Sequence, residues 1–499
     1  NLNYERLTVA QMQARIQACL DQTQSAEPDK WLEVVNWFRE AMLPNGVTTT
    51  HATLDVLKTR RPIFVMSSFG HTGLVNARGL QLAKITVATP NPLGGRIDRD
   101  SSGTPTGILE DAAFEKVVAV IPKPTPAEDH KAAMAALEAM RKQGVTTFLD
   151  AMATPRTLAA FAAVQKEGAL TARAHFAVLI TPEQGRDPKQ AVATAGALAH
   201  RYDQGAAGPE PGITVRNVKL FMDGVITAPA CTGAMLSPYF ANVGTASEPR
   251  WSPGTNRGPE VYFTAAVLRS LLIEAARAGL EPHMHADGDR AVHEALDGVA
   301  ALRQVFPGSA IRAAIAHDEI VDPGDFGRFK ELDATPVLSF QWEKPAPDTI
   351  DGAQEYLGPE RFKYLEPAGY LAAAGARIAY GSDWPVDPLN EWFALKVAVT
   401  RENDPAAGAK YAGRLSTDPG LTLPAAIRAI TNGSAYELHA EQEVGSLEVG
   451  KLADFIVLDR NVFEISPQQV ASVRVLLTVV GGKAVHAAPP FAPAEAAVH

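Results

Sequence analysis

Four side chains with metal-binding chemistry follow short apolar segments between residues 215 and 383: Lys219, His285, His317 and Asp383. Imidazole nitrogens and a carboxylate are ligands that zinc and similar divalent ions take in proteins. A single histidine at such a position is more often structural, so the argument depends on four residues in series. A divalent ion that they hold can polarise a carbonyl group and activate water, which predicts hydrolytic chemistry.

Lys219 is the unusual member of this set, because a protonated lysine cannot bind a cation. A neutral, desolvated lysine can react with CO₂ to give a carbamate, which supplies a bridging oxygen ligand. An apolar strand around the amine lowers its pKa and favours that reaction. The alternative is that Lys219 forms an ion pair with Asp223 or Asp383, and the residues alone leave both interpretations open.

His283 and His285 are two residues apart on one strand, so both side chains point to the same face. One interpretation is that the pair binds a metal together. The other is that only His285 reaches the site, while His283 packs or forms a hydrogen bond one layer deeper. The second interpretation is favoured here.

The candidate ligands belong to a regular alternation of apolar, β-branched segments with helical segments. The apolar segments are residues 145–149, 174–179, 215–221, 282–285, 313–317, 336–340 and 377–380, and the helical segments include 264–278, 289–303, 366–375 and 390–400. This rhythm predicts a parallel α/β fold. Seven strands are one short of a closed (β/α)₈ barrel, in which the active site lies at the carboxyl ends of the strands.

The remaining segments show other patterns. Residues 8–22 have helical periodicity with Thr8 as the N-cap, and a helix is predicted between Trp31 and Trp37. Residues 63–66 predict a strand, 88–107 a loop rich in Gly and Pro, 127–143 a helix and 423–438 the last helix. Residues 442–487 predict a small all-β unit.

Composition limits the functions to be considered. The chain has 499 residues, a net charge of -10 and ordinary globular composition. The acidic balance argues against nucleic acid as a partner. The sequence contains no uninterrupted apolar run of ~18 residues, which is the length that a membrane-spanning helix requires. Two cysteines exclude a disulfide framework and leave the compartment undetermined. A homodimer is compatible with the sequence.

Several longer motifs resemble the metal-dependent amidohydrolase superfamily, and in particular its YtcJ-like branch, amidohydrolase family 3. They are the segments 70–76 (GHTGLVN), 103–110 (GTPTGILE), 218–224 (VKLFMDG), 285–292 (HADGDRAV), 381–386 (GSDWPV) and 445–455 (GSLEVGKLADF). The resemblance covers nearly the whole chain, and its motifs are specific when taken together.

The resemblance implies a (β/α)₈ TIM-type barrel with one or two divalent ions, usually zinc, and a small β-sandwich built from both ends of the chain. It also implies an insertion between barrel strands 1 and 2. Lys219 would end strand 4, His285 strand 5, His317 strand 6 and Asp383 strand 8. The expected units are a helix after strand 1 (1–24), the inserted subdomain (25–135), strands 2–8 with the metal site (136–440) and the C-terminal part of the sandwich (441–499).

The activity implied by the resemblance is hydrolysis of amide C–N bonds, with N-substituted formamides or N-acyl amines as small-molecule substrates. Asp383 would bind metal, take a proton from the metal-activated water and pass it to the leaving nitrogen. His71 would donate to the oxyanion or only pack in its loop. Trp342 and Trp384 would wall a pocket for the leaving group, and Asp223 is expected to contact substrate.

Two other functions compete with amide hydrolysis. One is an esterase or lactonase on the same metal centre, and the other is a non-catalytic binding protein that has lost its metal site. Metal analysis separates the binding protein from the enzymes, and competing amide and ester substrates separate the two hydrolases.

One expected motif is absent. Strand 1 of the resembling family ends in a His-x-His pair that supplies two ligands to the more buried metal, but His283-Met284-His285 lies on the expected strand 5. We therefore expect this chain to be a fragment, or to be paired with a separate chain that carries strand 1. As written, it would bind at most one metal well and be poorly active.

Overall fold

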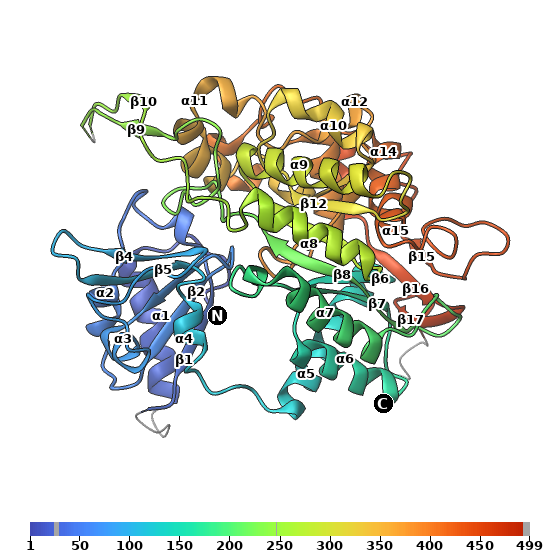
Figure 1. The fold of residues 1–499 in the computed structure, drawn as a ribbon. Helices are drawn as coiled ribbons and strands as arrows, with labels where there is room; N and C mark the ends of the chain where they lie inside the picture. Colours follow the sequence, from blue (N-terminus) through green and yellow to red (C-terminus); the bar gives the residue numbers. More distant parts are fainter. Residues whose placement is uncertain (24–28, 246, 493–499) are drawn as a thin grey trace.

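The computed structural model describes residues 1–23, 29–245 and 247–492, and a curled parallel sheet forms its centre (Figure 1). The sheet has the order β14-β13-β12-β11-β8-β7-β6, and every pairing is parallel. Its strands are β6 Thr147–Ala153, β7 Arg173–Leu179, β8 Ile213–Phe221, β11 Glu281–Ala286, β12 Ala313–His317, β13 Ala334–Leu338 and β14 Ala379–Tyr380. The prediction of a parallel α/β barrel sheet with seven strands is confirmed.

Helices cover the outer face of this sheet, as expected for strands that are apolar on both faces. They are α5 Pro126–Gln143, α6 Pro155–Lys166, α7 Pro188–Tyr202, α8 Ala265–Arg277, α9 Asp289–Val305, α10 Phe326–Glu331, α12 Ala368–Ala373 and α13 Glu391–Thr400. A further helix, α11 Glu355–Phe362, packs with the connection after β8 instead. Local sequence sets their ends: Thr125 and Glu128 form a capping box on α5, and Gly144 ends it at φ 87°. In the part of the chain that is described, the edge strands β14 and β6 do not pair with each other.

Strand register fixes the depth of the candidate ligands. His285 lies opposite Phe221 of β8, whereas Lys219 lies opposite His283. On the other side, Ala286 lies opposite His317. Lys219 therefore lies two residues deeper in the sheet than His285, and the two histidines end their strands at nearly the same level.

A second unit contains a five-stranded sheet of order β1-β2-β3-β5-β4. Its strands are β1 Leu32–Trp37, β2 Ile63–Ser67, β3 Thr72–Val75, β4 Gly95–Arg99 and β5 Pro105–Asp111, and its helices are α1 Val9–Gln22, α2 His51–Asp55, α3 Ala77–Leu82 and α4 Glu115–Val118. Thr8 caps α1 as predicted. Met12, Ile16 and Leu20 of α1 share one core with Val34 and Ile63 of the sheet, so α1 packs as part of this unit.

Two predictions for this unit were wrong. Residues between Trp31 and Trp37 form strand β1 and no helix, since they alternate between buried and exposed and pair with β2. The segment expected as loop contains β4 and the start of β5, which pair with each other. Gly and Pro residues mark the turns around these strands. β4 and β5 form a local hairpin, whereas β1 is fixed by pairing with β2 and β5 also by pairing with β3.

The C-terminal all-β unit is a three-stranded antiparallel sheet of β15 Phe455–Leu458, β16 Val475–Val480 and β17 Lys483–Ala487. A buried ion pair joins it to the barrel sheet, since Arg173 Nε lies 2.7 Å from Asp454 Oδ2 and both side chains are 3% exposed. Before this unit, the single helix predicted for 423–438 is divided into α14 Leu423–Arg428 and α15 Ser434–Glu437 by the π-helix Ala429–Gly433.

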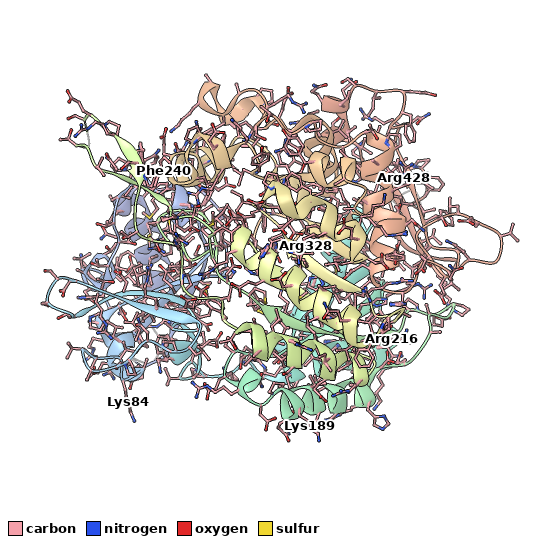
Figure 2. All side chains as sticks on the ribbon, turned by 45° about the horizontal axis from the view of Figure 1, so that its top comes forward. Lys84, Lys189, Arg216, Phe240, Arg328 and Arg428 are labelled. Atoms are coloured by element: carbon pink, nitrogen blue, oxygen red, sulfur yellow. The ribbon has the colours of Figure 1, made fainter. Side chains whose placement is uncertain are left out.

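The long connection after β8 forms a projecting hairpin of β9 Phe240–Asn242 and β10 Trp251–Pro253. Figure 2 shows Phe240 on this hairpin, while Lys84 and Lys189 mark the outer surfaces of the two units. The Trp251 ring packs on Tyr356 with their centroids 4.8 Å apart. Among the described residues, none of the helices has the length and apolarity that a membrane crossing requires.

Candidate metal centre

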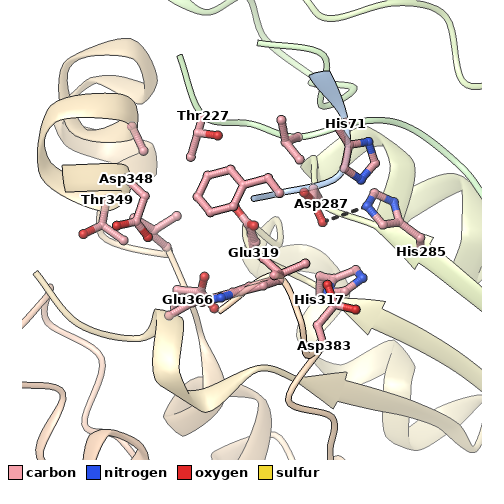
Figure 3. A pocket seen from close by; sticks show the side chains of 16 residues that line it. His71, Thr227, His285, Asp287, His317, Glu319, Asp348, Thr349, Glu366 and Asp383 are labelled. Atoms are coloured by element: carbon pink, nitrogen blue, oxygen red, sulfur yellow. Dashed lines mark ion pairs between the residues drawn. The ribbon is translucent and has the colours of Figure 1, made fainter. Parts of the chain in front are cut away.

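A cavity of about 470 Å³, including its open mouth, lies at the carboxyl ends of the barrel strands (Figure 3). It is lined by Phe69, His71, Val225, Thr227, His285, Asp287, His317, Glu319, Trp342, Asp348, Thr349, Ala353, Leu365, Glu366, Asp383 and Val386. Of the residues predicted for the site, the structure brings together His71, His285, His317, Trp342 and Asp383. Lys219, Asp223 and Trp384 lie outside the lining.

His285 and His317 end the neighbouring strands β11 and β12, and their ring centroids are 4.7 Å apart. Both residues are buried, and the Nδ1 atoms of both rings and Oδ1 of Asp287 have no hydrogen-bond partner among the described residues. One ligand atom from each of these three residues lies within 4.8 Å of the other two. Buried polar atoms without partners are costly, and a divalent ion satisfies this set, so the residues present fit a metal.

The electrostatics of the two imidazoles agree with this reading. Burial lowers the pKa of His285 well below its usual value, and His317 lowers it further. Burial also lowers the pKa of His317, and Lys219 adds to the shift. Both rings are therefore neutral at pH 7, which is the form of histidine that binds metals.

The backbone at the strand ends is held in an unusual conformation. His317 and Asp383 have φ values of 80° and 50°, and both belong to the left-handed region that side chains other than glycine rarely adopt. Such conformations persist only where the surroundings fix them, and they concentrate at functional sites. Here they turn the chain out of β12 and β14 while the two side chains remain at the cavity.

Asp223, predicted to contact substrate, is instead buried beneath the cavity. Its carboxylate accepts hydrogen bonds from the backbone N–H groups of Ala234, Asp287 and Gly288 at 2.8, 3.0 and 2.9 Å. Its Oδ1 also lies 3.3 Å from His285 Nδ1. Burial raises the pKa of Asp223 to about 7 although these donors lower it. This position holds the loop of Asp287 through backbone hydrogen bonds and places a carboxylate beside His285 without a hydrogen bond to its ring.

Lys219 is buried in β8, with its Nζ 4.7 Å from the centroid of the Phe221 ring. Burial lowers the pKa of Lys219 to about 8, although Asp383 and Asp287 raise it in part. Burial therefore favours the neutral form of the amine. Lys219 forms no ion pair within residues 1–23, 29–245 and 247–492, so the predicted alternative of pairing with Asp223 or Asp383 is not seen.

His283 does not reach the cavity. It is 3% exposed, and its Nδ1 lies 3.0 Å from Oε1 of Glu437 on α15. This is the deeper hydrogen-bonded position that the second interpretation of the His283–His285 pair predicts.

Asp383 and Trp342 close the cavity from β14 and β13. Asp383 follows β14, and the residue as a whole is exposed. Protein atoms nevertheless surround its carboxyl group, so desolvation raises its pKa. The charges of Lys219 and His71 lower the pKa in part. The Trp342 ring stacks on His317 with centroids 5.4 Å apart, and its Nε1 donates to Asp387 at 2.8 Å. Trp384 is half-buried beside the cavity.

His71 reaches the site from the turn between β2 and β3, and its ring centroid is 5.1 Å from that of His285. Its Nδ1 lies 2.6 Å from Oδ1 of Asp111, whose Oδ2 accepts a hydrogen bond from the hydroxyl of Tyr262 at 2.6 Å. Burial alone would lower the pKa of His71, but the hydrogen bond and charge of Asp111 raise it above its usual value. An imidazolium held in this way has only Nε2–H free to donate.

Several residues of the site were not identified from the sequence. Asp287 and Glu319 each follow a predicted metal ligand by two residues, which is a signal that could have been used. Asp111, Tyr262, Asp348 and Glu366 lie in connections or in the other unit, where no periodic pattern indicated them.

A curled parallel barrel sheet whose carboxyl ends present two neutral histidines and carboxylates defines the class of metal-dependent hydrolases. Comparison with known sequences agrees, since residues 2–486 match the amidohydrolase family Amidohydro_3. The chain belongs to this family and is a metal-dependent amidohydrolase.

Individual relatives are distant but match over most of their length. The chain is 25% identical to the putative amidohydrolase YtcJ of Bacillus subtilis over 480 residues, covering 94% of this chain and 82% of YtcJ. It is 25% identical to the N-substituted formamide deformylase of Arthrobacter pascens, covering 91% of this chain and 79% of that enzyme. The crystal structure of an uncharacterized metal-dependent hydrolase from Pyrococcus horikoshii has the same fold, with a TM-score of 0.64, 22% identity and coverage of 97% and 83%.

Proposed function

We propose that the chain hydrolyses the C–N bond of N-substituted formamides or related N-acyl amines. The observation that carries the proposal is the set of ligand atoms of His285, Asp287 and His317, within 4.8 Å of one another at the wall of a cavity of about 470 Å³. The printed activity of the Arthrobacter pascens relative supports a formamide as the first substrate to test.

His285, His317 and Asp383 would hold the metal, for which zinc is the first candidate, and Asp287 is a further ligand at the same site. When bound, such an ion supplies Lewis acidity and lowers the pKa of water. Lys219 joins this set as a carbamate. In that reaction the neutral Nζ would attack the carbon of CO₂: an N–C bond forms as one C=O π pair moves onto oxygen, and one amine proton is lost to solvent, so the product carries an anionic oxygen that could serve as a ligand. Burial of the amine supports this step, since it increases the neutral fraction.

Asp383 would accept the proton of the attacking water and deliver it to the leaving nitrogen. A proton shuttle works best when its pKa lies near the operating pH, and desolvation raises the pKa of this carboxyl toward that range. Asp383 also lies at the exposed side of the site, where water can approach.

His71 would stabilise the oxyanion that develops on the carbonyl oxygen. Its Nδ1 is engaged by Asp111, so the donor must be Nε2 of the protonated ring. Asp111 and Tyr262 act through His71 and are positioning residues. Phe69, Trp342 and Leu365 give the cavity apolar surface for the substituent on nitrogen.

The test uses N-pentylformamide and its ester analogue pentyl formate, assayed with zinc-loaded protein. We expect hydrolysis of the formamide, and we expect His317→Ala to lose both bound zinc and activity. His200→Ala, which changes an exposed histidine on α7, is the matched control and should retain both. Hydrolysis by a metal-free His317→Ala protein at the wild-type rate would refute the proposal. Turnover of pentyl formate alone would assign the site to ester hydrolysis.

A further inference from the structure

We propose that the cavity selects substrates that carry an organic cation, an alkylammonium or guanidinium group, on the part of the substrate that points away from the metal centre. This inference names the substrate class of the proposed hydrolase and in that respect rests on the proposed function. It follows from the side of the cavity opposite His285 and His317.

That side presents Asp348 and Glu366, and Glu319, whose side chain also hydrogen-bonds Asp287, lies beside them; we call these three carboxyl groups the acidic wall. Glu319 follows β12, Asp348 belongs to the π-helix Pro347–Gln354 and Glu366 precedes α12. Figure 3 shows Asp348 and Glu366 across the cavity from His285. Glu319 lies between these two residues and His285 in this view. Three separate elements therefore bring carboxyl groups to one surface, where they would repel one another as ions; burial, and then the charge of Glu319, raises the pKa of Glu366 well above its usual value, and a bound cation would favour the ionised form.

Glu366 gives the independent indication that a ligand is missing. Its residue is 2% exposed, it lines the cavity, and its carboxylate takes part in no hydrogen bond or ion pair among the described residues. Its backbone, in contrast, is held firmly: its N–H donates to the Glu319 carbonyl at 2.7 Å, and its carbonyl accepts from Arg401 at 2.7 Å. Glu366 thus presents an unpartnered carboxyl group to the cavity from a fixed backbone. Burial raises its pKa well above the usual value, and a bound cation would offset the cost of its negative charge.

The protein places its one described cationic lining side chain, His71, beside His285 and supplies none to the acidic wall. No lysine or arginine is among the described residues that line the cavity. Arg401 is the buried cation behind Glu366, but its guanidinium is already matched by Glu343 at 3.2 Å and Asp418 at 3.5 Å. Lys344 attracts Asp348 from outside the lining, and its Nζ donates to the carbonyl of Gln341 at 2.5 Å.

The remaining lining favours an organic cation over a second metal ion. Phe69, Trp342, Leu365 and Val386 line the same cavity as the acidic wall. Aromatic and aliphatic surface suits the alkyl body of an ammonium ion, and aromatic faces attract its charge. A small, strongly hydrated metal ion would prefer oxygen ligands on all sides.

The test compares two substrates of the same shape. N-(4-aminobutyl)formamide ends in an ammonium group where N-pentylformamide ends in a methyl group. We expect zinc-loaded wild-type protein to prefer the ammonium substrate by about tenfold or more in kcat/KM, which equals about 1.4 kcal/mol. In Glu366→Gln this ratio should fall about tenfold, mainly through KM for the ammonium substrate. Glu360→Gln, at an exposed position on α11, should leave the ratio unchanged.

Binding measurements separate this inference from the proposed function. Calorimetry with butylammonium and with 1-butanol requires no turnover. Metal-free wild-type protein should bind butylammonium more tightly than 1-butanol. Glu366→Gln should lose this difference. If neither formamide reacts but this preference holds, the proposed function fails and the inference stands. If Glu366→Gln does not fold, Asp348→Asn replaces it. Equal kcat/KM for both formamides, or loss of one bound zinc in Glu366→Gln without any ammonium preference, would overturn the inference.

Discussion

The link between His71 and Asp111 leads to a sharp prediction about pH dependence. Only the protonated ring can donate from Nε2 while Nδ1 holds Asp111, so catalysis by His71 is present below its pKa and is lost as the pH rises through it. Asp111 raises that pKa, whereas burial lowers it. Replacing Asp111 with a neutral side chain should therefore move the alkaline limb of activity to lower pH.

The size of the shift follows from the 2.6 Å contact between His71 Nδ1 and Asp111 Oδ1. A hydrogen bond between charged groups contributes about 1.5–3 kcal/mol, and one pKa unit corresponds to about 1.4 kcal/mol. Asp111→Asn should thus lower the limb by about one to two pH units. Near neutral pH kcat should fall, up to the 10²-fold scale that loss of one oxyanion donor causes. Asparagine tolerates the φ of 51° at this position, so the backbone should be retained.

The assay is kcat/KM for N-pentylformamide between about pH 5 and 9, with zinc content measured for each protein. Asp21→Asn, an exposed change on α1 of the same unit, controls for the lost charge. His71→Ala should remove the limb that Asp111→Asn shifts. A wild-type pH profile in fully metal-loaded Asp111→Asn would refute the role assigned to this pair.

Three further predictions concern other parts of the molecule. Asp383→Asn should lower kcat about 10²-fold or more while zinc stays bound, because the amide cannot accept the proton, and near-normal turnover would remove Asp383 from the mechanism. Lys219→Ala should lose metal occupancy, measured by elemental analysis, and a short carboxylic acid should restore part of it. A native intact mass of the wild-type protein that equals the mass of the unmodified chain, with no CO₂ attached, would count against the carbamate. Arg173→Ala should lower the free energy of unfolding by about 3–5 kcal/mol, because Asp454 is left buried and unpaired, and an unchanged denaturation midpoint would contradict this.

The barrel was predictable because buried parallel strands are apolar on both faces. Segments such as 313–317 therefore stand out in the sequence, and a polar residue such as His317 at their end attracts attention. The depth of Lys219 relative to His285 was not predictable, because it depends on register between β8 and β11.

The errors have physical reasons as well. The segment between Trp31 and Trp37 contains residues that suit either secondary structure, and its pairing with β2 decided in favour of a strand. Glu366 and Asp348 lie on connections whose path depends on packing, so sequence gave no indication that they face the same cavity as His285. Asp111 meets Tyr262 across 151 positions of the chain, which no local pattern can reveal.

The origin of His71 has a consequence for how the enzyme can be controlled. The metal ligands belong to the barrel sheet, whereas His71 is carried by the five-stranded sheet and is tied to the barrel side through Asp111 and Tyr262. A small separation of the two sheets would withdraw His71, the proposed oxyanion donor, and leave the proposed metal ligands in place. With the roles proposed above, metal affinity and turnover would be separable properties in this architecture. Variants at the junction can be inactive yet fully loaded, so metal content alone does not report on catalytic competence.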